Sequence, residues 1–213
     1  MWGLQDPGAA SGVVPGALRS VTEERSGSAD LGLSSGESAA FSSQIFTNNI
    51  RVTVMSFAAG ILLCLGTAFV LLYNGVVFGA IGGMAFGVGN GDRFLALVTP
   101  HGVLELSCIV VAAAAGLRMG WAIVVPGAKT RLEALTVEAR RSMEIVLGTA
   151  PWLVLAGIVE GFVTPSGLGI PAALAVGFGI GSAYWALMWW RGGGSPDNGI
   201  EQASLTGGRA LSL

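Results

Sequence analysis

Three ionisable side chains lie inside apolar stretches of the sequence and are its main candidates for chemistry. His101 and Glu105 belong to TPHGVLELSCIVVAAAAGLRMG (99–120), and Glu160 belongs to a later apolar block. A carboxylate in hydrocarbon costs about 2.5 to 3.5 kcal/mol even on insertion scales, so such groups usually pair or serve a function. The three residues therefore predict an intramembrane polar site.

Two interpretations of this polar site remain open. In the structural one, the two glutamates form hydrogen bonds with His101, Asn74 or backbone amides of an irregular segment at membrane depth. In the functional one, the cluster forms a proton or ion relay, or it docks a polar side chain of a partner protein. We favour the structural interpretation.

The spacing of these residues indicates how helices would position them. His101 and Glu105 are four residues apart, so on a helix they share one face, which Cys108 and Ala112 continue. Glu160 lies on a similar stripe of small and polar residues in its own block. We expect all three side chains near the outer ends of their spans, where they can converge on one site.

The composition is typical of a membrane protein. The 213 residues are 52% hydrophobic and only 11% charged, and the mean hydropathy is +0.68, whereas about a quarter of the residues in an average soluble domain are charged. The net charge is -2, and the sequence contains no basic or acidic tract that would indicate a nucleic-acid partner. The bilayer itself is the first partner that the composition predicts.

No catalytic or cofactor-binding constellation is found in the sequence. HExxH is absent, and one histidine with two carboxylates is a poor metal-ligand set. Ser166 and Ser182 lack a nucleophile-elbow context, and no P-loop or dinucleotide signature occurs. We therefore expect no enzyme activity, no cofactor and no metal.

The pattern along the chain predicts an all-α fold, a polytopic bundle of transmembrane helices. Residues 1–40 are expected to be a flexible polar tail without a signal peptide, residues 41–191 the transmembrane domain, and residues 192–213 a disordered tail. A span needs about 20 residues. The apolar blocks predict about four full spans plus a glycine-rich re-entrant or short fifth segment; the blocks are 50–73, 75–91, 94–125, 144–163 and 168–190. We expect residues 75–100 to dip into the membrane from the outer face.

The distribution of positive charge predicts the orientation. Segment 126–143 carries Lys129, Arg131, Arg140 and Arg141, so it should be cytoplasmic, as an amphipathic helix on the inner surface of the cytoplasmic membrane. Both termini are then expected in the cytoplasm. Five residues are predicted as membrane anchors at the ends of spans, namely Arg51, Arg118, Trp189, Trp190 and Arg191.

Glycines recur at every fourth position in two of the blocks. Such rows form a bare groove along a helix, in which another backbone can approach closely. We predict helix-packing faces at these rows, which comprise Gly75, Gly79, Gly83 and Gly87 in the second block and Gly177 and Gly181 in the last.

Several stretches together resemble the stage II sporulation protein M family of integral membrane proteins. The resemblance covers about 41–190 and is carried by FTNNIRV (46–52), GTAFVLLYNGVVFGAIGG (66–83), the 99–120 stretch and IVEGFVTPS (158–166). The family motif falls on ten residues, namely Asn48, Asn49, Asn74, Gly75, Pro100, His101, Gly102, Glu105, Glu160 and Pro165.

The resemblance implies a function that the composition and the residue spacing do not predict by themselves. The family's namesake works in engulfment during endospore formation as a membrane component associated with two cell-wall-degrading partners, and relatives occur in organisms that make no spores. Family members often have a cytosolic helical region before the first span. We therefore expect a non-enzymatic membrane scaffold that recruits membrane or envelope proteins, including cell-wall hydrolases. A transporter subunit that uses Glu105, Glu160 and His101 is the alternative.

Overall fold

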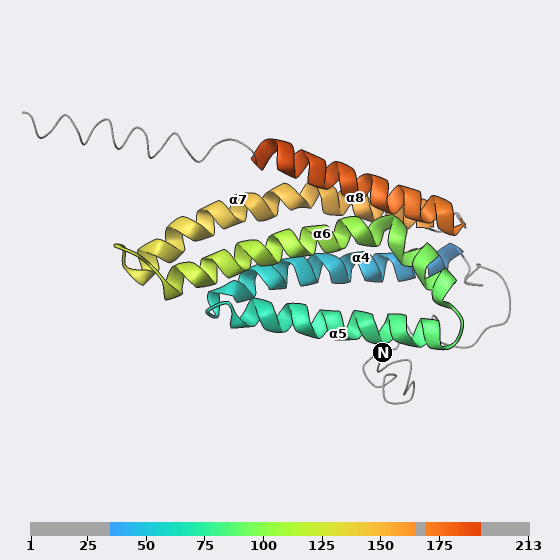
Figure 1. Ribbon diagram of the computed structural model, residues 1–213, viewed down its shortest axis with the longest axis horizontal. Coiled ribbons are helices and arrows are strands. Elements are labelled where there is room, and N and C mark those ends of the chain that lie inside the picture. The colour runs from blue at the N-terminus through green and yellow to red at the C-terminus, as the bar shows by residue number, and fades with distance from the viewer. Residues whose placement is uncertain (1–34, 165–168, 193–213) are drawn as a thin grey trace, which may run out of the picture. The chain divides into compact units, whose positions relative to one another are not determined.

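The computed structural model describes residues 35–164 and 169–192 of the chain, and in these ranges it consists of helices and short connections (Figure 1). The helices, in chain order, are α4 (Ser35–Ala58), η2 (Ala59–Ile61), α5 (Leu65–Gly87), α6 (Gly91–Val124), α7 (Arg131–Ile158), η3 (Val159–Val163) and α8 (Ile170–Gly192). Four helices are long and apolar enough to cross a membrane: α5, α6, α7 continued by η3, and α8. The predicted fold class is confirmed, with α4 as the fifth helix.

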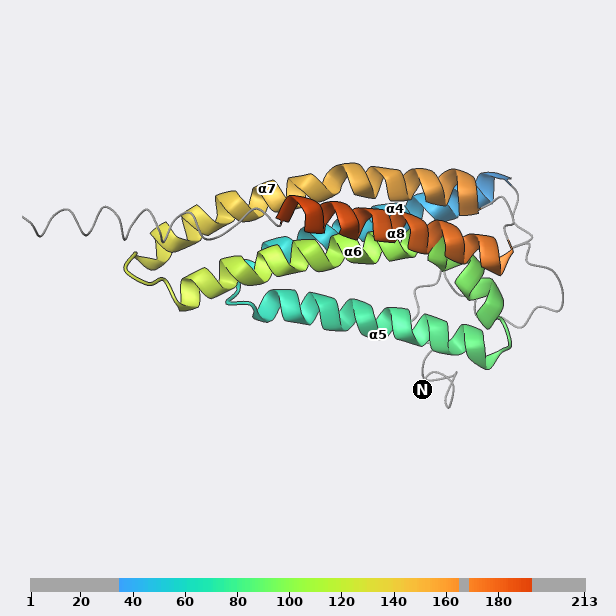
Figure 2. The ribbon, with the colours of Figure 1, turned by 45° about the horizontal axis from the view of Figure 1, so that its top comes forward.

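Helix α6 is the centre of the packing and contacts α4, α5 and α7. It runs parallel to α4 and antiparallel to α5 and α7, and it lies between α5 and α7 in both views (Figure 1, Figure 2). Its buried residues are mostly small, among them Cys108, Ala112, Ala115 and Gly116. Small side chains let the neighbouring helices approach closely, which is how helices associate where no hydrophobic effect drives them together. The described residues up to Gly181 form one compact unit, and Ser182–Gly192 belong to a second.

The chain reverses between α4 and α5 in a tight turn against α6. Leu63 and Cys64 have φ values of 52° and 71°, in the left-handed region that non-glycine residues rarely adopt. A side chain at Gly60 would collide with the backbone of Gly116, and one at Gly120 would lie 2.5 Å from the backbone nitrogen of Cys64. The Thr67 hydroxyl also donates to the carbonyl of Ser56 at 2.7 Å. The glycines of α6 thus permit the contact that holds this turn.

The predicted dip at residues 75–100 is wrong. The glycine-rich segment completes α5, and the chain reverses at Val88–Asn90, where Gly89 has a φ of 79°. The break that was expected after residue 73 occurs at residues 59–64, inside the predicted first span. A continuous helix satisfies its own backbone hydrogen bonds in lipid, whereas each interior glycine costs only about 1 kcal/mol relative to alanine. Glycine richness alone therefore does not interrupt the span.

The basic segment 126–143 does not form a separate helix on the membrane surface. Residues 131–143 are the first part of α7, which begins with a capping box between Thr130 and Glu133. Its apolar side chains Leu135 and Ala139 pack against a cluster of Phe57, Ala112, Ala115 and Met119. The apolar face therefore covers α6, and the helical pattern continues into the span because no breaking residue separates the two parts.

The N-terminal boundaries of two helices also differ from expectation. Helix α4 begins at Ser35, within the range expected for the polar tail, and α6 begins at Gly91, so Pro100 lies inside a helix rather than in its first turn. Proline removes one backbone donor and bends a helix, and the ribbon of α6 bends in its first third (Figure 1). The two termini, expected in the cytoplasm, lie outside the described residues.

Candidate functional site

The polar site lies between α4, α6 and η3, in the half of the bundle nearer the α5–α6 turn. His101 and Glu160 form an ion pair through Nδ1 and Oε2, and their side chains are 5% and 2% exposed. The Thr164 hydroxyl donates to Glu160 Oε2 at 3.2 Å and lies 3.3 Å from His101 Nδ1. Because the two charged groups belong to different helices, the pair ties the end of α7 to α6.

Glu160 reaches this position from a π-helical turn. The turn η3 follows α7 directly and contains Glu160 at its second residue. A π turn widens the helix by one residue and often marks a functional position within an α-helix. The widening changes the direction of the following side chains, and Glu160 and Thr164, four residues apart, both contact His101.

Glu105 lies one helical turn beyond His101 and has a partner of its own. Asn49 of α4 donates from Nδ2 to Glu105 Oε2. The second carboxylate oxygen, Oε1, is buried and has no hydrogen-bond partner within the described part of the chain. The site thus consists of two polar pairs on neighbouring turns of α6, one toward α4 and one toward η3.

Asn74 was also predicted as a member of the site. Its amide donates to the carbonyl of Val70 in its own helix at 2.8 Å. Asn74 lies seven residues from both Thr67 and Ile81, which are buried, so it is on the inward side of α5, where it is half-buried and bonds to its own helix. The asparagine that completes the site is Asn49.

The predicted glycine rows have two different environments. A side chain at Gly177 would collide with the backbone of Thr99, and one at Gly181 would lie 2.5 Å from Val103 Cγ1, so this part of α8 approaches α6 closely. Gly75 and Gly79 of α5 have nothing within 4 Å of an added Cβ. Gly83 is partly exposed and Gly87 is exposed. The groove along α5 is therefore not filled by the described residues.

Three of the five predicted anchors, namely Trp189, Trp190 and Arg191, lie in the last turn of a helix. Arg118, in the last third of α6, pairs with Glu138 of α7 at 2.7 Å, and its side chain is 53% exposed. Trp189, Trp190 and Arg191 are exposed at the end of α8. Arg51 lies in the second half of α4 with seven residues of the helix after it, compared with six after Arg118 in α6. It was expected at the start of a span, and α4 instead begins at Ser35.

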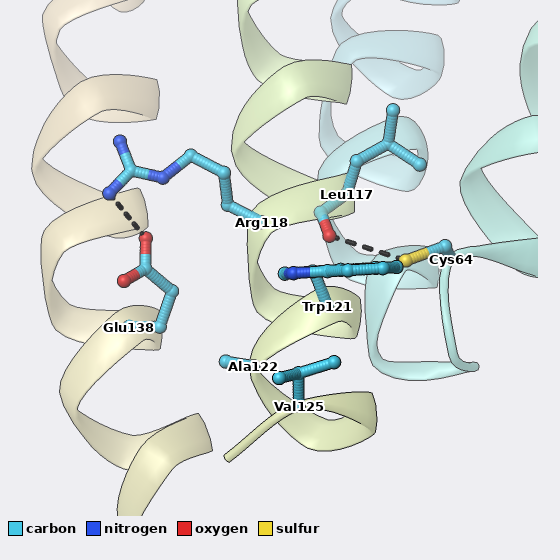
Figure 3. A pocket seen from close by; sticks show the side chains of 7 residues that line it. All are labelled: Cys64, Leu117, Arg118, Trp121, Ala122, Val125 and Glu138. Carbon is cyan, nitrogen blue, oxygen red and sulfur yellow. Dashed lines mark hydrogen bonds and ion pairs between the residues drawn. The ribbon is translucent and has the colours of Figure 1, made fainter. Parts of the chain in front are cut away.

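The Arg118–Glu138 pair borders an open cavity of about 590 Å³ (Figure 3). In Figure 3 the Trp121 ring lies next to Cys64, whose thiol donates to the carbonyl of Leu117 at 3.3 Å. The cavity lies at the end of the bundle with the α6–α7 loop, far along α6 from the polar site. No group of three or more metal-ligating His, Cys, Asp or Glu side chains occurs in residues 35–164 and 169–192.

Sequence reasoning missed Asn49 and Glu138 as partners of the charged residues. Asn49 follows Asn48 in the polar part of α4, and only the packing of α4 parallel to α6 brings it to Glu105. Glu138 lies in a charged segment, seven residues after Arg131. Its ion pair with Arg118 forms only because α6 and α7 pack antiparallel. Pro165 of the family motif lies outside the described residues.

Comparisons with known proteins agree with this membrane architecture. The family model described as Stage II sporulation protein M matches residues 10–165. An uncharacterised protein of Methanocaldococcus jannaschii is 28% identical over 123 residues, which cover 57% of this chain and 69% of that protein. No solved structure matches the chain. The match to the family model extends over most of the chain and includes the polar site, so the chain belongs to the Stage II sporulation protein M family of membrane proteins.

Proposed function

We propose that this multi-pass membrane protein is a non-enzymatic scaffold that recruits or assembles partner proteins in the cytoplasmic membrane. The observation that carries the proposal is that its buried charged groups are paired across helices. His101 pairs with Glu160, and Asn49 donates to Glu105. Each pair joins two helices, and a protein that must present fixed surfaces to partners needs such links.

The family supports the same role. The family match covers residues 10–165. The resemblance to this family implies work beside cell-wall-degrading enzymes during engulfment, and a scaffold that positions cell-wall hydrolases or other envelope proteins fits that role. We propose that the basic end, with Lys129 and Arg131, faces the cytoplasm. The α5–α6 turn and the start of α4 then face the outer side of the membrane, which differs from the cytoplasmic side expected for the N-terminal end of the chain.

Co-purification tests this proposal. The tagged full-length chain is solubilised in mild detergent, and the proteins that accompany it are identified by mass spectrometry. Glu105→Gln preserves the size of the side chain and its acceptor for Asn49, so we expect the variant to retain the same partners. Loss of all partners from the Glu105→Gln variant, at unchanged thermal stability, would contradict a purely structural role of Glu105.

A transporter subunit is the second candidate, and one observation favours it. The buried Glu105 Oε1 lacks a partner in the described residues, and the His101–Glu160 pair lies one turn away. A series of neighbouring ionisable side chains within the membrane is typical of proton relays. If the chain conducts protons, Glu105→Gln must abolish the flux while leaving the complex with partners intact.

A further inference from the structure

Helix α4 presents a polar stripe on the side facing away from the bundle. Its inward residues Val52, Thr53, Ser56 and Phe57 are buried against the other helices. Its outward residues are exposed and surround Arg51, with Thr47 and Asn48 before it and Val54 and Met55 after it. We call the exposed surface of Thr47, Asn48, Arg51, Val54 and Met55 the α4 outer face.

The depth of this face follows from α6. The uncharged stretches of α6 lie between Arg93 and Arg118, and Glu105 is midway between them. At about 1.5 Å per residue, Glu105 is about 18 Å from Arg93 and about 20 Å from Arg118. This centres it in a hydrocarbon core of about 30 Å, deeper than the outer end of the span at which it was expected. Asn49 contacts Glu105, and Arg51 follows two residues later, about 3 Å along α4. Arg51 therefore lies near the middle of the bilayer.

An exposed arginine at this depth needs a partner. Long basic side chains reach the headgroups most readily from positions near the ends of a span, and the contact of Asn49 with Glu105 places Arg51 close to mid-depth. No ion pair of Arg51 occurs in the described part of the chain, where the ion pairs are His101–Glu160 and Arg118–Glu138. Contact with lipid would leave the guanidinium and the amide of Asn48 without hydrogen bonds.

From this geometry we propose that the α4 outer face binds a transmembrane helix of a partner protein that carries an Asp or Glu near its midpoint. The carboxylate would pair with Arg51 in the fork geometry that favours arginine over lysine, while Val54 and Met55 contact apolar residues of the same helix. A two-fold contact with α4 of a second copy does not fit, because it would bring two Arg51 side chains together. This proposal rests on the scaffold function, because it states the chemistry of a partner that the scaffold would recruit.

Model peptides test the proposal without knowledge of the natural partner. The full-length protein is labelled with a donor dye and reconstituted in vesicles of neutral lipid with acceptor-labelled transmembrane peptides of leucine and alanine. The peptides differ only at the central residue, which is Glu, Gln or Leu. We expect energy transfer to show about tenfold tighter association of the Glu peptide than of the Leu peptide.

Protein variants assign the effect to Arg51. Arg51→Leu should abolish the preference for the Glu peptide, and Arg51→Lys should retain only part of it. Arg140→Leu, which removes an exposed arginine from the basic start of α7, is the matched control and should behave like the wild type. Because Arg51 is exposed, equal thermal midpoints of all variants in detergent are expected and exclude unfolding as the cause.

Three results would overturn the proposal. The first is equal binding of the Glu and Leu peptides to the wild type, and the second is a preference for Glu that persists in Arg51→Leu. The third is energy transfer between copies of the protein that Arg51→Leu abolishes, which would assign the face to a second copy. These outcomes are separate from failure of the scaffold function, which would appear as a proton flux that depends on Glu105.

Discussion

At the scale of residues, the intramembrane charges are paired across helices. His101 belongs to α6 and Glu160 to η3, so their ion pair exists only when the two segments are packed. Sequence alone predicted that His101, Glu105 and Glu160 converge, because each lies on a small polar stripe of an apolar helix. It did not predict the partner of Glu105, because Asn49 and Asn74 are chemically equivalent and only the three-dimensional packing distinguishes them.

The His101–Glu160 pair makes a prediction for a double-mutant cycle. Removing one member leaves the other buried without its partner, which costs about 3 to 5 kcal/mol for a fully charged pair and less where the remaining group becomes neutral. We expect His101→Leu and Glu160→Leu each to lower the thermal midpoint in detergent. The double variant, which buries two apolar groups, should be more stable than the sum of the two losses predicts.

Thermal unfolding monitored by circular dichroism, on protein in one detergent at one pH, measures this cycle. Thr136→Ala is a control, because its hydroxyl bonds only to Leu132 of its own helix on an exposed face. Strictly additive losses in the double variant would contradict a direct link between His101 and Glu160.

At the scale of elements, the α4–α5 turn depends on glycines of α6. The four-residue glycine rows predicted helix-packing faces, but the sequence could not show which neighbour each face meets. The row on α5 has open positions at Gly75 and Gly79, whereas the closest backbone approaches involve Gly60, Gly116 and Gly120. The reversal at Leu63 and Cys64 was also missed, since neither residue type favours a positive φ.

A comparison of two glycines in helix interiors tests this packing. An alanine at Gly116 would place its Cβ 2.6 Å from the carbonyl oxygen of Ser56, so backbone atoms would have to move. Gly148 in α7 has nothing within 4 Å of an added Cβ. We expect Gly116→Ala to destabilise the protein by about 1 to 3 kcal/mol and Gly148→Ala to leave it unchanged or stabilise it by up to about 1 kcal/mol.

Thermal midpoints of the two glycine variants in the same detergent check this difference. The reverse ranking, with Gly148→Ala the less stable variant, would show that the turn does not pack on α6 as described.

At the scale of the whole molecule, composition predicted a polytopic helical membrane protein, and the four long apolar helices confirm it. The sequence could not locate all helix boundaries, because the apolar blocks merge across the α4–α5 turn and the glycine-rich end of α5 looks interrupted. The sequence did not predict α4 as a separate fifth helix, because α4 is more polar than the other four. Its inner face is covered by protein, and its outer face carries Arg51.

The arrangement of the helices predicts which loops share a side of the membrane. In a background without Cys64 and Cys108, single cysteines are placed at Leu62, Gly89 and Thr130 and labelled with a membrane-impermeant maleimide. The α4–α5 and α6–α7 connections, which contain Leu62 and Thr130, lie at one end of the bundle, and the α5–α6 connection, which contains Gly89, lies at the other (Figure 1). We expect Gly89→Cys to be labelled in intact cells, and the other two only after permeabilisation.

Labelling of Leu62→Cys and Thr130→Cys from opposite sides would contradict the antiparallel arrangement of α5 and α6. Labelling of these two cysteines together in intact cells, with Gly89→Cys protected, would preserve the fold and reverse the proposed orientation.

We propose that the buried polar groups hold the helices together and do not conduct protons. Purified protein is reconstituted in vesicles that contain a pH-sensitive dye, and the decay of an imposed pH gradient is followed for the wild type, Glu105→Gln and empty vesicles. We predict that the pH gradient decays at the same rate with the wild type, with Glu105→Gln and in empty vesicles. A faster decay with the wild type that Glu105→Gln returns to the rate of empty vesicles would contradict it.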